Sequence, residues 1–524
     1  MSLSHDALQQ DRDALLELLL AEEEAAAAEA ASRPLAPSFT GEDAARAPLS
    51  SGQRRLWLLH ELAPQSPAYN LTSVLRTRGP LRVDAFGEAV SGVVARHAIL
   101  RTTFHRGPDE PLQRIHPPHR VPLPLDDLVP LPPAERDAEV RRCVAEETDR
   151  PFDLERGPAL RLRALRLAAD EHLLLISAHH IVFDGWSMGL FVAELAALYR
   201  AAARGEQPAL PPVALQFADH VAWERQQDFA PQIDYWRRTL AGVPDLELVA
   251  DRPPAALPSF AGASLPFALP SATTEALRRV ARRHGATLFM ALLAGFETLL
   301  SRYSGQDDFA LGIPVANRGR PEVEQTIGFF VNTLALRAHL GGEPTFSELL
   351  ERTRAAVSEA FSHQDAPFER VVQALHPERN TLHLPLVRVV FALQNAPGGP
   401  LALDDLTLEP LPVERRSAKF DLALLVREAE AGLDGELEYA TERFDAATAA
   451  RMLDHFRVLL EAAAAAAQTP IAALPMLTEA ERRQLAGWND SARPYPRDDG
   501  LGPLVARQAE RTPQAMAVEF GTVR

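Results

Sequence analysis

Cysteine and positive charge are both scarce in this chain. Cys143 is the only cysteine among 524 residues, which excludes an intramolecular disulfide and a thiolate metal cluster. Lys and Arg number 54 against 71 Asp and Glu, so the formal net charge is −17 at pH 7. A protein that binds duplex nucleic acid normally carries the opposite balance, because it must neutralise phosphates. We therefore expect no nucleic-acid partner.

Targeting and membrane-spanning segments are missing as well. Residues 1–13 hold no basic stretch followed by an apolar run, unlike a secretory signal. The longest uncharged low-complexity runs are alanine tracts such as Ala462–Ala467, far shorter than the ~20 residues that a membrane span needs. The composition, 46% hydrophobic and 24% charged, is that of a globular protein. We expect a cytoplasmic protein without a membrane partner.

Sequence signatures of bound cofactors and metals are also missing. There is no GxxxxGK[ST] loop, no GxGxxG after a predicted strand and no HExxH, so we expect neither a bound nucleotide nor a metal ion. A basic cluster covers residues 317–320, with Arg318 at its centre. It fits a solvated loop, an ion-pair partner for a buried carboxylate, or a clamp for a phosphate-bearing substrate arm.

The length predicts three or four structural units at ~150 residues each. Residues 1–48 form a helical appendage and linker, whose acidic helix at Asp11–Glu29 either docks on another subunit or packs on its own domain. Residues 49–215 and 216–470 are two mixed α/β halves. Residues 471–524 are predicted to be a linker, because prolines interrupt every candidate element before a strand begins at Ala515.

Periodicity predicts the main elements of the two halves. Apolar residues at helical spacing predict helices, and short apolar or alternating runs predict strands. The helices are expected at Asp84–Arg96, Ser187–Arg204, within Thr274–Tyr303 and at Phe346–Phe361, and the strands at Leu100–Phe104, Leu160–Leu167, Leu173–Ser177, Phe309–Pro314, Thr333–Arg337 and Leu386–Gln394.

The segment SAHHIVFDGWS, residues 177–187, is the most specific local motif. It places His179 and His180 at the end of a buried strand, and Asp184 and Gly185 in a turn before a helix. Neighbouring side chains on an extended chain point to opposite sides, so one histidine faces a cavity while the other packs inward. A carboxylate four residues on can fix the loop or hold an imidazole in one tautomer. A catalytic histidine and a structural histidine pair both fit this pattern.

The same segment contains a competing motif. Residues 185–189, GWSMG, match the GxSxG nucleophile elbow of serine hydrolases, with Ser187 as the nucleophile. The elbow needs a strand that runs straight into the turn, whereas LLLIS ends about ten residues before Ser187. His363 and His383 are available as downstream bases, but nothing singles them out. Serine hydrolysis therefore stays the weaker hypothesis.

With HHIVFDG found, the chain resembles the condensation domain of nonribosomal peptide synthetases from Leu49 to about Ala467. Seven family-like motifs occur in family order. They are SSGQRRLWLL (50–59), RHAILRTTF (96–104), AHHIVFDGWS (178–187), QFADHVAW (216–223), IGFFVNTLALR (327–337), HQDAPFERVV (363–372) and ERNTLHLPL (378–386). The departures from the family pattern are Gly52, Ala98, His220-Val221 and Asn317.

The resemblance implies an α/β fold of two chloramphenicol-acetyltransferase-like lobes, arranged as a V-shaped pseudo-dimer around a central tunnel. Donor and acceptor carrier proteins deliver acyl groups on phosphopantetheine arms in trans, and this chain itself binds no cofactor. The acceptor α-amine attacks the donor thioester and forms an amide. The enzyme class implied is an amide-forming acyltransferase of secondary-metabolite and antibiotic biosynthesis.

The resemblance also implies roles for individual residues. His180 lies where the tunnel mouths converge and positions the amine or removes its proton, and His179 supports the strand. Asp184 pairs with Arg318, and Gly185 permits the close turn and offers a backbone N–H near the reacting carbonyl. The candidates for the tunnel lining are Trp186, Ser187, Asn332 and Gln394.

Residues 471–524 resemble the linker and first residues of an adenylation domain, which is therefore an expected partner. The donor is expected in trans, either aminoacyl or peptidyl, or a fatty-acyl or polyketide group in a starter-type reaction. Plant-type acyltransferases carry a DFGWG motif that is absent here. Cyclisation domains replace the histidines with aspartates, and epimerisation domains normally follow a carrier domain. A catalytically silent carrier-recruitment module is the alternative from another class.

Overall fold

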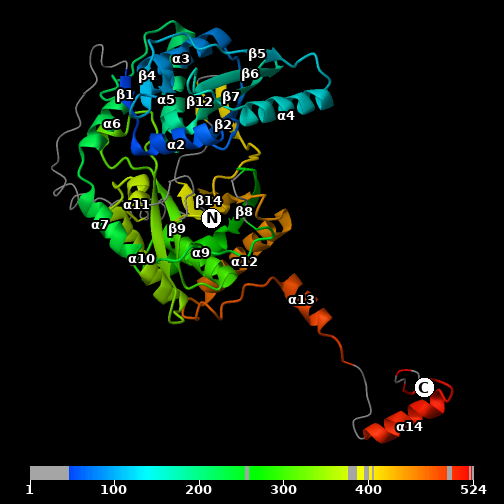
Figure 1. Cartoon of the computed structure of the whole chain (residues 1–524). Coiled ribbons are helices and arrows are strands. Elements are labelled where there is room, and N and C mark those ends of the chain that lie inside the picture. Colours follow the sequence, from blue (N-terminus) through cyan, green and yellow to red (C-terminus); the bar gives the residue numbers. More distant parts are fainter. Residues whose placement is uncertain are drawn as a thin grey trace. The chain divides into compact units, whose positions relative to one another are not determined.

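The structure is a computed structural model that describes residues 46–253, 259–375, 386–394, 401–403, 406–492, 499–518 and 521. These residues belong to two compact units that divide between Met476 and Leu477. The first unit contains both predicted α/β halves (Figure 1). The predicted helix at Asp11–Glu29 and most of the motif at residues 378–386 lie outside the described residues.

A six-stranded sheet organises the first lobe of the larger unit. Its central strand contains the continuous apolar run Leu173–Ser177, a pattern that suits a strand buried on both faces. Leu173 and Leu175 pack beside Cys143 of a covering helix, whereas Leu174 and Ile176 enter the main core on the other face. In spatial order the strands are β12 (Leu401–Leu403), β13 (Leu406–Leu411), β2 (Asn70–Arg78), β7 (Glu171–His179), β6 (Leu160–Ala168) and β5 (Leu125–Asp127).

The helices of the first lobe cover both faces of this sheet (Figure 1). A small three-stranded sheet lies beside it and consists of β1 (Arg46–Pro48), β4 (Leu112–Ile115) and β3 (Thr102–His105). The sequence placed Arg46–Pro48 in the appendage, but its residues pair with β4. The helices are α2 (Ser51–Leu62), α3 (Val83–Arg96), η2 (Ala98–Arg101), α4 (Pro133–Asp149), η3 (His180–Val182), α5 (Gly185–Arg204) and α6 (Phe217–Gln226).

A second six-stranded sheet organises the other lobe. The strands follow the order β10 (Asn332–His339), β9 (Asp308–Val315), β11 (Val389–Gln394), β14 (Leu422–Ala429), β15 (Gly432–Ala440) and β8 (Gly262–Pro270). The helices are α7 (Ala230–Thr239), α8 (Ser271–Arg283), α9 (Leu288–Ser304), η4 (Pro321–Val323), α10 (Phe346–Ser362), α11 (Phe368–Leu375) and α12 (Ala446–Ala465). Within the described residues, no single helix is long and apolar enough to cross a membrane. The bent pair α8–α9 meets that test jointly, by length and composition alone.

One hairpin of the second half belongs to the first lobe. Strands β12 and β13 follow β11 in the chain, yet β13 pairs with β2, with Leu411 opposite Val74. Leu406 and Leu408 contribute to the core of the first lobe. The predicted boundary near residue 216 therefore does not coincide with a division between the two sheets, because the strand pair β12–β13 from the later half belongs to the sheet of the earlier half.

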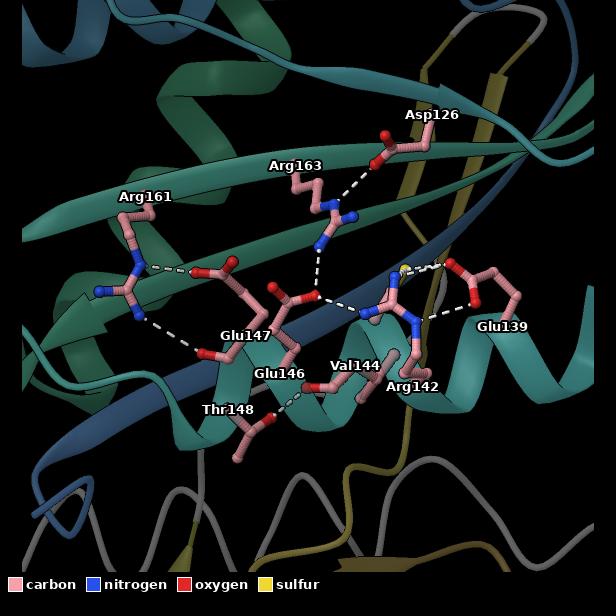
Figure 2. Close-up of polar contacts among 10 residues, drawn as sticks. Asp126, Glu139, Arg142, Val144, Glu146, Glu147, Thr148, Arg161 and Arg163 are labelled. Atoms are coloured by element: carbon pink, nitrogen blue, oxygen red, sulfur yellow. Dashed lines mark hydrogen bonds and ion pairs between the residues drawn. The ribbon is translucent and has the colours of Figure 1, made fainter.

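Helix α4 is fixed to the first sheet by ion pairs (Figure 2). Arg161 and Arg163 extend from β6 toward the helix, where Arg161 Nε lies 2.7 Å from Glu147 Oε1. Arg163 bonds Asp126 at 2.6 Å and Glu146 at 3.2 Å. Because the Arg161 and Glu147 side chains are largely shielded from water, screening by salt affects this pair less than an exposed one. The C-terminal end of α4 is thereby held in place.

The predicted elements of both halves form with small boundary changes. The strand expected at Leu100–Phe104 begins only at Thr102, because the preceding residues form η2. The tail differs from its prediction. Helices α13 (Glu479–Trp488) and α14 (Leu501–Arg511) form there, since Pro503 lies in the first turn of α14, where a missing N–H costs no helical bond. No strand forms at residues 515–518.

Buried Glu297 on α9 gives a prediction for the pH dependence of stability. Its carboxyl accepts a 2.7 Å hydrogen bond from Thr353, and burial raises its pKa to about 8. The unfolded chain ionises this group near 4.5, so between these values the folded state holds a proton that the unfolded state releases. The free energy of unfolding should therefore fall as pH rises from about 5 to 8, by up to about 1.4 kcal/mol per pH unit.

Glu297→Gln keeps the shape of the side chain and removes the titration. Urea unfolding of parent and variant at several pH values checks the prediction. The parent should lose stability relative to the variant toward pH 8. Parallel curves for the two proteins would contradict it.

Candidate active site

His180 lies directly after the central strand β7 of the first sheet. Its backbone N–H donates to the Tyr69 carbonyl at 2.8 Å, and its Nδ1 bonds the Phe183 carbonyl at 2.7 Å. Because a carbonyl only accepts, Nδ1 carries the proton. Among the described residues Nε2 has no hydrogen-bond partner, and the residue stays partly exposed. The ring therefore presents a fixed, unoccupied lone pair.

The His180 imidazole is neutral at pH 7. Burial lowers its pKa well below 6.5, and the positive charge of Lys419 lowers it further. A neutral imidazole that donates through Nδ1 can accept a proton only through Nε2. This arrangement suits a group that holds an amine and takes up its proton.

His179 points to the other side of the strand and serves the fold. Its Nδ1 accepts from the Ile181 N–H at 3.1 Å. The rings of Tyr69, Phe152 and His60 surround it at centroid distances of 6.1 to 6.4 Å. Burial lowers its pKa to about 3, so the side chain stays neutral.

Asp184 and Arg318 meet in the interior. Arg318 Nη2 lies 3.3 Å from both carboxylate oxygens of Asp184, and both side chains are shielded from water. Asp184 also accepts from the Ser187 N–H at 2.7 Å, as N-cap of α5, and from the Phe330 N–H at 3.1 Å. Arg318 Nη1 donates to the Val323 and Thr326 carbonyls, each at 2.7 Å. Asp184 thus joins the loop at residues 180–184 to the segment before β10.

Two of the tunnel candidates are engaged inside the protein. Ser187 is fully buried, and its Oγ donates to the Gly328 carbonyl at 2.9 Å while accepting from the Gly328 N–H at 3.0 Å. Asn332 Nδ2 donates to the Gln364 and Ala366 carbonyls, each at 2.8 Å. Neither side chain has a polar group left for a substrate. Ser187 is equally unable to act as the nucleophile of a GxSxG elbow, because its Oγ is enclosed.

The other two tunnel candidates reach the surface. Trp186 is 47% exposed, and its Nε1 donates to the Glu324 carbonyl at 3.0 Å. Gln394 is exposed at the end of β11. The through-tunnel that the resemblance implies stays a prediction.

Helix α2 and Phe329 complete the surroundings of His180, and sequence reasoning did not single them out for this role. Gln53 Nε2 donates to the Ile181 carbonyl at 3.0 Å, so the first motif helps to fix the loop at residues 180–184. The Phe329 ring meets the His180 ring edge-on at 5.0 Å. A Cβ on Gly52 would come 2.8 Å from Phe329 Cε1. Glycine at residue 52, where the family pattern has alanine, therefore leaves room for this ring.

The other departures from the pattern also have structural places. Asn317 has φ 52°, a left-handed conformation that asparagine tolerates better than most residues and that glycine adopts freely. His220 is buried against Phe330 at 4.7 Å between ring centroids, and burial lowers its pKa to about 3. Ala98 donates its N–H to Gln216 at 2.8 Å.

The comparisons with known proteins agree with this geometry. A family model described as Condensation domain matches residues 44–486. The chain belongs to the condensation-domain family. Its class is that of the amide-bond-forming acyltransferase domains of nonribosomal peptide synthetases.

Relatives of this condensation domain are large synthetases. The chain is 42% identical over 479 residues to chondramide synthase cmdD of Chondromyces crocatus, and the match covers 90% of this chain and 12% of that protein. It is 40% identical over 511 residues to phosphinothricin tripeptide synthetase PhsB of Streptomyces viridochromogenes, and that match covers 93% and 43%. The condensation domain thus spans less than half the length of these relatives.

Solved structures share the fold. The X-domain from teicoplanin biosynthesis is 30% identical with a TM-score of 0.78, covering 85% of this chain and all of that one. A complex of that X-domain and OxyB is similar, with a TM-score of 0.76 and 30% identity, covering 86% of this chain and 99% of that one. The two lobes are those of condensation-domain structures.

Proposed function

We propose that this condensation domain joins a donor acyl thioester to the α-amine of an acceptor aminoacyl thioester, each on a phosphopantetheine arm of a carrier protein. The observation that carries the proposal is the His180 ring, with Nδ1 bonded to the Phe183 carbonyl and Nε2 unoccupied. As the amine attacks, the C–N bond forms and gives a tetrahedral adduct. The amine proton passes to Nε2 as the adduct collapses and the C–S bond breaks, and the same proton then passes to the departing thiolate, which leaves as the thiol.

The chemistry requires no strong base. A thioester carbonyl is already reactive, and a free α-amine titrates near ~8, so part of it is nucleophilic at neutral pH. The larger contributions come from aligning two tethered reactants and from stabilising the charged tetrahedral adduct. A neutral imidazole at a fixed position meets the first need, because it accepts a hydrogen bond from the incoming amine.

Gly185 is proposed to face the reacting carbonyl. The prediction that this glycine permits a tight turn fails, because Gly185 is the first residue of α5, has no left-handed φ and leaves a Cβ without a neighbour within 4 Å. We instead place the acyl group in the free space beside this exposed residue.

Gly185→Ala should therefore keep or slightly raise stability, by up to about 1 kcal/mol, since alanine favours a helix. Amide formation should fall at least about tenfold, a cost of about 1.4 kcal/mol in the transition state, because the methyl group occupies the acyl position. Gly189→Ala, on the same helix with equal space, is the matched control and should stay active. Full activity of Gly185→Ala would remove this residue from the site.

The donor and acceptor groups are tested directly by intact-mass analysis of an acceptor carrier. The condensation domain is incubated with a loaded acceptor and a panel of aminoacyl, peptidyl, polyketide and fatty-acyl donor carriers. Condensation adds the mass of one donor acyl group to the acceptor. A fatty-acyl or polyketide product alone would assign a starter-type, N-acylating reaction.

A recruitment module is the second candidate function. It is favoured by the similarity to an X-domain that is also known in complex with OxyB. Carrier binding without any product, across the whole donor panel, would support recruitment. The phosphopantetheine arms, both carriers, an adjoining adenylation domain and a cytoplasmic location belong to the proposal of a synthetase module.

A further inference from the structure

The only lysine of the chain lies beside the proposed active site. Of the 54 Lys and Arg residues, Lys419 alone is lysine. Its Nζ is 5.4 Å from the centroid of the Tyr69 ring, and the Tyr69 carbonyl accepts the His180 N–H at 2.8 Å. Tyr69 therefore contacts the ammonium through its ring and holds the catalytic loop through its backbone.

The charge of Lys419 is not neutralised by an ion pair within the described part of the chain. Glu438 attracts the ammonium, but its carboxylate is bonded to Arg415 at 2.7 Å. Burial lowers the pKa of Lys419 to about 8, so the group is charged at pH 7. An ammonium is a compact donor with three N–H groups, whereas a guanidinium is a wide planar fork. A chain that uses arginine at every other cationic position has kept the compact donor here.

Lys419 lines a small hollow of about 30 Å³, called here the Lys419 hollow. A second polar residue of the lining, Asn70, has an atom without a hydrogen-bond partner. Asn70 Oδ1 is buried without a hydrogen-bond partner, whereas Asn70 Nδ2 donates to the Thr148 and Arg150 carbonyls, each at 2.9 Å. The polar residues that line the hollow include Asn70, Thr148, Asp149, Arg415, Lys419 and Glu438.

The orientation of the Asn70 amide is fixed by α4. Arg161 bonds the Glu147 carboxylate at 2.7 Å (Figure 2). It also bonds the Arg150 carbonyl at 2.8 Å, and the two bonds hold the end of the helix. The Thr148 and Arg150 carbonyls can only accept hydrogen bonds, so the NH₂ group of Asn70 must face them. Asn70 Oδ1 is left as an acceptor, while Lys419 supplies a donor in the same hollow.

A ligand for this hollow needs one acceptor and one donor. Asp149 and Glu438 balance Arg415 and Lys419 in the lining, so the site has no net attraction for an anion. A buried unpaired acceptor is costly, and an ester or an alkyl chain has no N–H with which to satisfy it. A secondary amide has both groups.

We propose that the Lys419 hollow binds a secondary amide of a tethered substrate, with the Lys419 ammonium donating to its carbonyl and Asn70 Oδ1 accepting its N–H. This inference rests on the proposed function, since the substrates are the tethered acyl groups. Two sources carry this chemistry: the amides of the phosphopantetheine arm, and the peptide bond of a peptidyl donor.

The single lysine makes a direct binding test possible. Growth on ¹³Cε-lysine gives one lysine resonance for the whole chain, that of Lys419. We expect a saturable shift of this resonance with pantetheine, with N-acetylalanine methylamide, or with both, and none with hexyl acetate, which lacks an N–H. A shift with pantetheine alone identifies the arm, and one with the peptide mimic alone identifies a peptidyl group. The proposal is overturned if neither amide shifts the resonance at about 10 mM, ten times a weak Kd of about 1 mM. It is also overturned if hexyl acetate causes an equal shift.

Turnover gives a second, independent readout. Lys419→Met keeps the chain length and removes the donor, and should raise KM for the loaded carrier about tenfold or more with little change in kcat, as loss of a charged hydrogen bond predicts. Arg156→Met, at a side chain that is 89% exposed, is the control and should match the parent. An unchanged KM in a folded Lys419→Met contradicts the subsite. If His180→Ala stays active while the lysine resonance still responds to amides, the proposed function fails and the subsite stands.

Discussion

His180→Ala should lower amide formation between two loaded carriers by about 10²- to 10⁴-fold, the range of a lost acid–base group. The physical reason is that Nε2 is the acceptor for the amine proton, while Nδ1 is already bonded to the Phe183 carbonyl. The measurement is the rate of product formation on the acceptor carrier by intact mass, with both carriers saturating.

The fold must survive this change for the result to count. His180 is partly exposed and caps no helix, so thermal melting of His180→Ala should follow that of the parent. His119→Ala, an exposed histidine of the same lobe, controls for loss of an imidazole elsewhere and should retain full activity. Turnover near the parental rate in folded His180→Ala would remove this ring from the mechanism.

Asp184→Asn should reduce the free energy of unfolding by about 3–5 kcal/mol, because it leaves the buried Arg318 charge without its partner. The carboxylate also accepts the Phe330 N–H, a bond that the Asn amide can make on only one side. Denaturant unfolding at pH 7 checks the value. We expect soluble yield to fall with it.

A double-mutant cycle with Arg318→Met isolates the pair. The double variant should be destabilised by less than the sum of the single changes, since neither charge remains buried alone. Asp234→Asn, which removes the exposed partner of Arg237, serves as the control and should unfold like the parent. An Asp184→Asn protein that is as stable as the parent but inactive would contradict the structural role of Asp184 and indicate a role in the reaction.

The fold was predictable where the pattern is local. The apolar run at Leu173–Ser177 and the helical spacing before Gly205 need only their own residues to specify a strand and a helix, and both form. The hairpin β12–β13 was not predictable, because its short strands are stabilised by β2, more than 300 positions earlier. The number of prolines in the second unit suggested a linker, but the effect of a proline depends on its position. Pro503 lies in the first turn of α14, where proline is compatible with a helix.

The site was predictable to the same extent. His180 and Asp184 belong to one short motif, and the pair of Asp184 with Arg318, which the resemblance implied, is present. The bond from His180 to the Phe183 carbonyl was not predicted. The side chains of tunnel candidates Ser187 and Asn332 bond inward, which the sequence did not indicate, and their place in a tunnel lining stays a prediction. Lys419 was missed, although the chain offers a signal, a single lysine among arginines.

The return of β12 and β13 to the first sheet sets a rule for building hybrid synthetases. A chimaera that takes its earlier half from one parent and its later half from another, fused near residue 216, inherits an edge hairpin foreign to the sheet it must complete. Leu406 and Leu408 would then enter a core made of the other parent's side chains. Exchange of the earlier half therefore has to include residues 401–411 as a second crossover.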